Sequence, residues 1–260
     1  MKRLAPLLLV HGCAMPVVSA GTFLPAGDLK KGQLHASVSL EMGRVLAAPS
    51  DVDSKETPQA SQWEVSTWIA SDVSARYALT DRVALEAQLK LTNPITPFRP
   101  EPVGAAAGAR VRLVERAGDR GLSVELGGRV VGMWVRQELR REKSGGEAQT
   151  DRWSYRAVGV EAPLVVTMRW SGLLALTVAP FARAYWIRAF HDVVTVDGEV
   201  ETTRLDWTPV LSAGVGASVA LQLGPIEVAP GLAVELATRP GPTASTKVLL
   251  QPGLNLGMRF

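Results

Sequence analysis

The C-terminal segment of the chain alternates between two kinds of side chain, and this alternation constrains the fold more than any other feature of the sequence. Its even-numbered positions are apolar, whereas most of its odd-numbered positions are polar or small. Successive residues of a β-strand point to opposite faces, so the segment predicts a strand with one apolar face and one polar face. The even positions hold Val248, Leu250, Pro252, Leu254, Leu256, Met258 and Phe260, and the odd positions hold Lys247, Leu249, Gln251, Gly253, Asn255, Gly257 and Arg259.

The same period of two recurs along most of the chain. After residue 31 there is no run of about 18 apolar residues and no sustained helical spacing of apolar positions, so helical membrane spans are not expected. The pattern therefore predicts an all-β fold. Ten segments can be drawn, at residues 32 to 47, 62 to 79, 82 to 93, 104 to 116, 121 to 139, 152 to 170, 173 to 191, 204 to 223, 226 to 239 and 245 to 260.

The connectors between these segments alternate in length. Four are short and rich in turn-forming residues: Thr80-Asp81, Ala117 to Arg120, Ser171-Gly172 and Gly224-Pro225. The others are longer, at residues 48 to 61, 94 to 103, 140 to 151 and 192 to 203, and more briefly at 240 to 244. Short turns at one end and longer loops at the other are typical of a transmembrane barrel with an even number of strands. We therefore expect a single antiparallel up-and-down transmembrane β-barrel of about ten strands, with eight or twelve as alternatives.

Aromatic residues favour this arrangement over a soluble barrel with an apolar core. Trp63, Trp153 and Trp207 adjoin long connectors, whereas Tyr77, Trp170 and Phe260 lie near short turns or the terminus. Such placement predicts two interfacial girdles. Trp153 shares the parity of charged residues, so only a bulge or a later strand start would turn it toward lipid.

Charged residues share the opposite parity and predict a polar barrel interior. In a narrow lumen, unpaired charges are costly, so opposite signs are expected to pair across it. A ten-stranded barrel is only slightly wider than the eight-stranded size that side chains fill, so we expect a largely plugged lumen. The expected network comprises Glu41, Asp72, Arg76, Glu86, Lys90, Arg110, Arg112, Glu125, Arg129, Glu161, Arg183, Glu227, Glu235 and Lys247.

The first twenty residues have the character of a targeting segment. Lys2 and Arg3 precede an apolar run, and Val18-Ser19-Ala20 places small residues at the last and third-last positions, which suits cleavage before Gly21. We therefore predict a signal peptide at 1 to 20, a periplasmic lead at 21 to 31 and the barrel at 32 to 260. An alternative is lipidation of Cys13, because the residues before it resemble a degraded lipobox.

Two stretches carry a resemblance to a known class of protein. The hairpin at residues 75 to 85 resembles the periplasmic hairpins of bacterial outer-membrane β-barrels, particularly small OmpA-like and OmpW-like barrels, without selecting one family. The terminal strand resembles their C-terminal assembly signal, here carried by Leu254, Leu256, Met258 and Phe260. The resemblance implies insertion by the barrel-assembly machinery, an outer-membrane location, and contact with outer-membrane lipids and lipopolysaccharide.

Motifs for catalysis, metals and cofactors are sparse. The sequence lacks a phosphate-binding glycine loop, a paired-cysteine motif, a zinc-protease helix and a nucleophile elbow, so no cofactor, metal or catalytic residue is expected. The formal charge of +3 is spread along the chain, which argues against a nucleic-acid surface. His191, Asp192 and Asp206 are level at the predicted outer rim, where a carboxylate could raise the basicity of a histidine.

The sequence thus favours a monomeric, non-enzymatic outer-membrane barrel with a structural or surface-interaction role. A narrow channel for small solutes is the second interpretation, and it would require the lumen charges to line one wall. A lipid or peptide hydrolase at the outer rim is the third.

Overall fold

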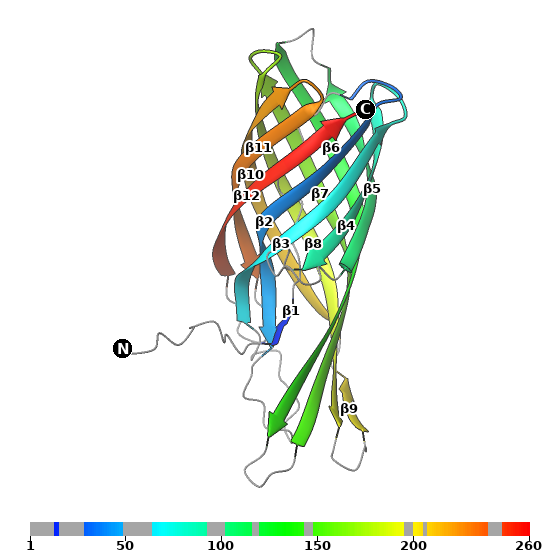
Figure 1. The fold of residues 1–260 in the computed structure, drawn as a ribbon, viewed down its shortest axis with the longest axis vertical. Helices are drawn as coiled ribbons and strands as arrows, with labels where there is room; N and C mark the ends of the chain where they lie inside the picture. The colour runs from blue at the N-terminus through cyan, green and yellow to red at the C-terminus, as the bar shows by residue number, and fades with distance from the viewer. Residues whose placement is uncertain are drawn as a thin grey trace, which may run out of the picture.

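The fold was examined in a computed structural model, which describes residues 13–15, 29–48, 64–92, 102–115, 120–142, 148–194, 200–204, 207–238 and 246–260. The described residues form strands and turns only, arranged as a closed barrel (Figure 1). Among them there is no helix long and apolar enough to cross a membrane. The predicted all-β, antiparallel up-and-down barrel is confirmed.

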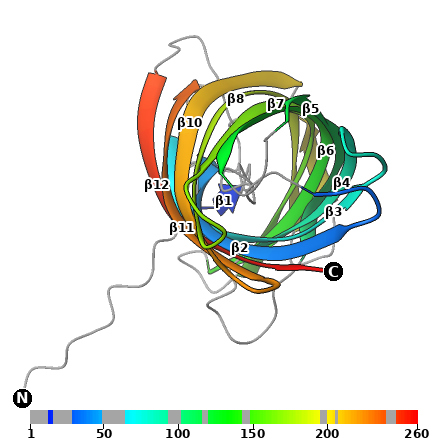
Figure 2. The same ribbon diagram turned by 90° about the horizontal axis from the view of Figure 1, so that it is seen from above.

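Ten strands make up the ring, in the order β2-β12-β11-β10-β8-β7-β6-β5-β4-β3, and pairing of β2 with β3 closes it (Figure 2). All recorded neighbours are antiparallel. The ring strands are β2 (Leu34–Ala48), β3 (Glu64–Ala78), β4 (Val83–Thr92), β5 (Pro102–Val114), β6 (Gly121–Glu142), β7 (Ala148–Arg169), β8 (Leu174–Val194), β10 (Thr208–Leu223), β11 (Ile226–Thr238) and β12 (Thr246–Arg259).

The barrel wall is apolar outside and polar inside. On β10, Leu211, Val215 and Val219 are exposed on the outer surface, whereas Ser212 and Ser218 are buried in the interior. A soluble barrel places its apolar face inward, so this inversion identifies a wall built to contact lipid. The period-two pattern sets the inversion directly, because alternate residues of each strand face opposite sides.

Three of the short turns use local hydrogen bonds or backbone geometry that their residues favour. The Thr80 Oγ1 accepts hydrogen bonds from the backbone N–H groups of Arg82 and Val83. The Ser171 Oγ likewise accepts hydrogen bonds from the backbone N–H groups of Leu173 and Leu174. Gly224 has a φ of 63°, and Pro225 follows with its ring-fixed negative φ, the sign pattern of a type II′ hairpin turn.

Strands β6, β7 and β8 extend further on the long-loop side than the sequence pattern predicted. β6 and β7 continue as a paired hairpin from Val135 to Tyr155 with only 143–147 outside the described residues, so the predicted connector at 140 to 151 was too long. The predicted connector at 192 to 203 is likewise wrong in extent, because β8 runs to Val194 and pairs with a separate strand, β9 (Val200–Arg204). β10 consequently starts at Thr208 and not at 204. Outside lipid both faces of a hairpin are solvated, so pairing can continue where apolar alternation stops.

A short strand, β1 (Cys13–Met15), lies within the segment predicted as the signal peptide. It pairs with Leu46 to Ala48 at the end of β2. The ring closes through β2, β3 and β12 without it, so removal of β1 leaves every ring pairing in place. Cleavage near Ala20 and lipidation of Cys13 both stay predictions, and residues 1–12 and 16–28 lie outside the described part of the chain.

The seam between the first and last ring strands is short. β12 pairs with β2 only from Gly253 opposite Glu41 to Arg259 opposite His35. The remainder of β12, from Thr246 to Pro252, pairs with β11 alone. The ring is therefore joined at this seam mainly along its short-turn half.

The inner wall contains a glycine that makes room for an aromatic ring. Gly159 on β7 lies directly opposite Tyr185 on β8, which is fully buried in the lumen. A Cβ added to Gly159 would lie 2.9 Å from Tyr185 Cε1 and 2.6 Å from the Ala184 carbonyl oxygen. The absence of a side chain here lets the tyrosine lie against the wall.

We expect Gly159→Ala to lower the free energy of unfolding by about 1–3 kcal/mol, because the new methyl group displaces the Tyr185 ring. The measurement is urea unfolding in lipid vesicles, followed by tryptophan fluorescence. Gly128→Ala is the matched control, since a Cβ at that outward position meets nothing within 4 Å. Equal stability of the two variants would contradict this account of Gly159.

Candidate functional site

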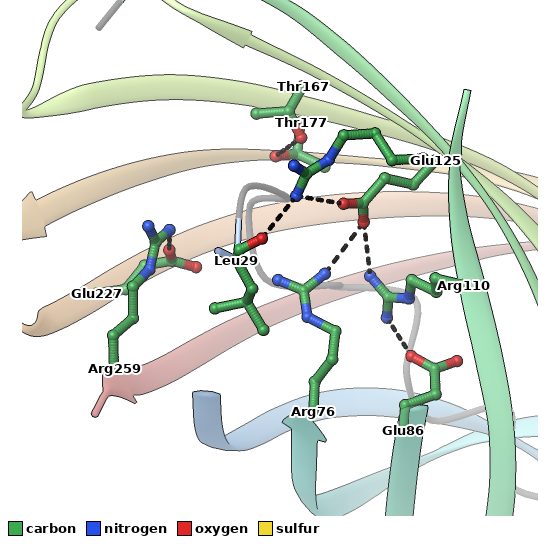
Figure 3. Close-up of polar contacts among 10 residues, drawn as sticks. Leu29, Arg76, Glu86, Arg110, Glu125, Thr167, Thr177, Glu227 and Arg259 are labelled. Carbon is green, nitrogen blue, oxygen red and sulfur yellow. Dashed lines mark hydrogen bonds and ion pairs between the residues drawn. The ribbon is translucent and has the colours of Figure 1, made fainter. Parts of the chain in front are cut away.

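The barrel interior holds buried charged side chains that meet in linked clusters. The first lies near the short-turn end (Figure 3). Arg110 forms an ion pair with Glu86 at 2.6 Å, and Arg76 pairs with Glu125 at 3.1 Å. Arg112 approaches the same Glu125 carboxylate at 3.5 Å. These side chains come from four adjacent strands, β3, β4, β5 and β6, and they link those strands across the inner surface of the wall.

The second cluster surrounds one carboxylate in the middle of the barrel. Glu161 on β7 is contacted by Arg129 at 2.5 Å, by Arg183 at 3.6 Å and by Lys90 at 3.9 Å. The Tyr185 hydroxyl donates a hydrogen bond to the same carboxylate. All of these side chains are buried. Three cations, from β4, β6 and β8, thus converge on one anion.

Further pairs continue around the ring. Arg183 also contacts Glu235 on β11 at 3.4 Å, and Gln251 on β12 donates to Glu235 at 2.9 Å. Arg259 pairs with Glu227 at 3.2 Å. These contacts join β8 to β11 across the intervening β10, and β11 to its neighbour β12.

The two clusters are joined by Arg129, whose Nε lies 3.7 Å from Glu86, and an amide side chain extends the network to Asp72. Gln88 donates a hydrogen bond to Asp72 at 2.7 Å and accepts one from Arg129 at 3.2 Å. Because the amide has both a donor and an acceptor, it bridges an acidic and a basic group at once. The interior is therefore one connected polar network from the short-turn end to mid-barrel.

The segment before β2 lies against the short-turn mouth of the barrel. Leu29 is 2% exposed, and its carbonyl oxygen accepts a hydrogen bond from Arg112 at 3.0 Å (Figure 3). Gly32 donates its backbone N–H to the Ala78 carbonyl at the end of β3. A cavity beside Leu29 has a volume of only about 10 Å³, enough for about one water molecule.

The predicted lumen residues fall on the inner face wherever their side chains are described. Those of Glu41 and Lys247 lie outside the described part, although their backbones are placed in β2 and β12. The inward-facing members are Asp72, Arg76, Glu86, Lys90, Arg110, Arg112, Glu125, Arg129, Glu161, Arg183, Glu227 and Glu235.

Neutral polar residues complete this interior and were absent from the predicted network. Their parity in the sequence could have identified them, because each shares the inward face of its strand with a charged residue. Their partners could not be identified in this way, because contacts across the lumen depend on the stagger of distant strands. Buried examples are His35, Gln88, Tyr185, Gln251 and Asn255.

The predicted girdle residues have different outcomes. Tyr77, Trp170 and Phe260 are exposed on the outside near the short turns, and Trp207 is exposed at the other end. Trp63 lies outside the described residues, as does the side chain of Trp153, whose backbone pairs with His191. Two outward-facing tryptophans were missed, Trp134 at 52% exposure and Trp186 at 45%.

The predicted assembly residues occupy the outer face of the last strand. Leu254, Leu256 and Met258 alternate along β12, and Phe260 follows its end with 67% of its surface exposed. The backbone groups of Phe260 exchange hydrogen bonds with Leu34, so the terminal residue is anchored to the first ring strand.

The proposed rim chemistry finds little geometric support. His191 pairs through its backbone with Trp153 and Thr203, whereas Asp206 lies outside the described residues. Asp192 is half-buried on the opposite face of its strand from the position of His191. Within the described ranges, no group of three or more His, Cys, Asp or Glu side chains could hold a metal ion.

Among the known proteins compared with this chain, similarity was found to solved structures and not to family models or curated sequences. No protein-family model and no curated protein sequence matches the chain. The Yersinia pestis attachment invasion locus protein Ail, solved with the heparin analogue sucrose octasulfate, is 11% identical over 88% of this chain and 99% of its own, with a TM-score of 0.33. Neisserial surface protein A is 11% identical over 88% and 98%, with a TM-score of 0.35. The Escherichia coli outer-membrane protease OmpT is 8% identical over 88% and 93%, with a TM-score of 0.41.

We expect Glu161→Gln to lower the free energy of unfolding by about 3–5 kcal/mol, because it leaves three buried cations around a neutral side chain. Urea unfolding in lipid vesicles checks this. Glu115→Gln, at an exposed position beside the end of β5, is the control and should leave stability unchanged. A Glu161→Gln protein as stable as the control would show that the ion cluster contributes nothing to the folded state.

Proposed function

We propose that this chain is a bacterial outer-membrane β-barrel whose lumen is closed to bulk solute flow and whose role is structural or in surface interaction. The inverted wall supports the membrane placement, because an apolar outside and a charged inside are stable only when lipid surrounds the barrel. Both described ends of the ring, Leu34 and Phe260, lie on the short-turn side, which is the periplasmic side in such barrels.

The observation that carries the closed-lumen proposal is the arrangement around Glu161. Arg129 and Arg183 lie directly opposite Glu161 on the neighbouring strands β6 and β8, and Lys90 reaches it at 3.9 Å from β4, three strands away. The cluster therefore extends from one stretch of wall into the lumen. Solutes in a selective channel pass beside rows of charge, and binding there must be weak enough to release them. Buried pairs of this kind instead occupy the space through which a solute would move.

The outward extension of the barrel supports a surface role. Beyond Trp134, β6 continues for eight residues to Glu142, and its pairing with β7 is unbroken. At about 3.3 Å per residue this adds about 26 Å along the strand, comparable to the height of the apolar band of a membrane barrel. Figure 1 shows this hairpin reaching well past β5, with the β8–β9 hairpin extending at the same end. A paired hairpin of that length presents a preformed surface to the exterior.

We expect the purified barrel to give no stepwise conductance in planar lipid bilayers, because the buried ion pairs and Leu29 occupy the path. Single-channel recording in symmetric salt is the measurement, with a general porin as the positive control. Reproducible current steps that depend on the sign of the permeating ion would instead favour the narrow channel.

Surface exposure of the hairpin can be tested separately. An epitope inserted in the 143–147 connection should be accessible to antibody on intact cells, because that connection joins the outer ends of β6 and β7. The same epitope inserted between Gly224 and Pro225 should become accessible only after the outer membrane is opened. Labelling with the reverse preference would contradict the proposed orientation.

A further inference from the structure

Three arginines gather on the outward face of the barrel at its long-loop end. Arg156 on β7 lies directly opposite Arg188 on β8, and Arg204 on β9 lies directly opposite Phe190 on β8. Arg156 and Arg204 are exposed and Arg188 is half-buried. All three continue the parity of the lipid-facing residues of the wall, so the arginine cluster, defined as Arg156, Arg188 and Arg204, faces away from the lumen.

An aromatic ring holds two of these cations side by side. The guanidinium carbon of Arg156 lies 5.4 Å from the centre of the Phe190 ring, and that of Arg188 lies 5.3 Å from it. Each contact is within the range of a cation–π interaction. Two guanidiniums over one ring repel each other, so the arrangement favours an anion that both can contact.

Tryptophans place the arginine cluster at the level of lipid headgroups. Trp134 lies directly opposite Arg156 on the neighbouring strand, and Trp186 precedes Arg188 by two residues on the same face. Trp207 adjoins the pair Thr208–Ile187, which brings it beside Arg188. Each of these rings is about half exposed on the outer wall. Outward-facing tryptophans mark the membrane–water interface, where lipid phosphates lie.

The hydrogen-bonding capacity of the arginine cluster is not used within the described part of the protein. Its guanidiniums form no ion pair with a described carboxylate, in contrast to the arginines of the lumen. The Arg188 Nε is buried and finds no acceptor among the described residues. A buried donor without an acceptor is costly, and an anionic oxygen at this position would satisfy it.

We propose that the arginine cluster binds the phosphate groups of a phosphorylated glycolipid in the outer leaflet. Arginine presents paired N–H donors that match phosphate oxygens, and Phe190 orients two of the three guanidiniums toward the lipid side. The acyl chains of such a lipid would extend along the apolar wall below the tryptophans. This inference rests on the proposed outer-membrane placement, which the epitope experiment tests independently of lipid binding.

The test is titration of the detergent-solubilised barrel with bisphosphorylated lipid A, followed by native mass spectrometry. We expect the variant R156Q/R188Q/R204Q to bind at least about tenfold more weakly than the wild-type chain, because each arginine contributes separately at an anionic surface. The variant with three lysines at these positions should bind with intermediate affinity, since it keeps the charge but loses the paired donors.

Two controls separate specific recognition from general attraction. K31Q/R82Q/R120Q removes the same charge from exposed positions at the short-turn end and should bind lipid A like the wild type. Dephosphorylated lipid A should bind the wild type and R156Q/R188Q/R204Q equally. Inorganic phosphate, titrated as a competitor, distinguishes a site for any phosphate from one that requires the lipid.

Weaker binding of lipid A by R156Q/R188Q/R204Q alone would support the proposal. Retained affinity in R156Q/R188Q/R204Q, or an equal loss in the short-turn control, would overturn the proposal. So would tight binding of dephosphorylated lipid A that depends on the arginines. If the triple variant lacks the heat-modifiable migration of a folded barrel, R156Q and R204Q are measured singly, because both side chains are exposed.

Discussion

Closure of the backbone hydrogen-bond ladder is the constraint on which the rest of this structure depends. A sheet surrounded by lipid cannot leave an edge of N–H and C=O groups unpaired, so the first strand must meet the last. Pairing of β2 with both β3 and β12 meets that requirement. Once the ring is closed, alternate side chains have only two destinations, the lipid or a narrow interior. The polar residues that face inward thereby share one space with residues from distant strands.

Two features let many polar side chains share the narrow interior: opposite charges lie close together, and small residues lie beside large ones. Glu161 is compensated by three cations, and Glu125 is shared between Arg76 and Arg112. Sharing matters because a charge held in a site poor in water is tolerated only with partners close by. Gly159 provides the volume that the Tyr185 ring occupies. The same side chains therefore balance one another's charge and pack against the inner face of the wall.

Parity along each strand predicted the faces of the wall, because lipid imposes period two wherever a strand crosses the membrane. Leu254 and Met258 face outward and Arg129 inward for this reason alone. The contact between Arg183 and Glu235 could not be predicted, since it depends on the stagger of β8 and β11, which are separated by β10. Nor could the length of the β6–β7 hairpin, because the period weakens in water, where both faces are solvated. The outward face of Trp134 could have been predicted from its even position in the strand. Its place in a girdle could not, because that depends on which residues lie opposite it on the neighbouring strands.

The seam between β12 and β2 holds seven residue pairs, whereas the ladders on its two sides hold thirteen and fourteen. Its two strands are also separated by almost the full length of the barrel sequence, so bringing them together carries the largest loop-closure entropy of any pairing in the ring. The pairing that costs the most chain entropy is therefore also the one with the fewest residue pairs. We therefore expect this seam to form late in assembly and to separate first under a force that opens the wall.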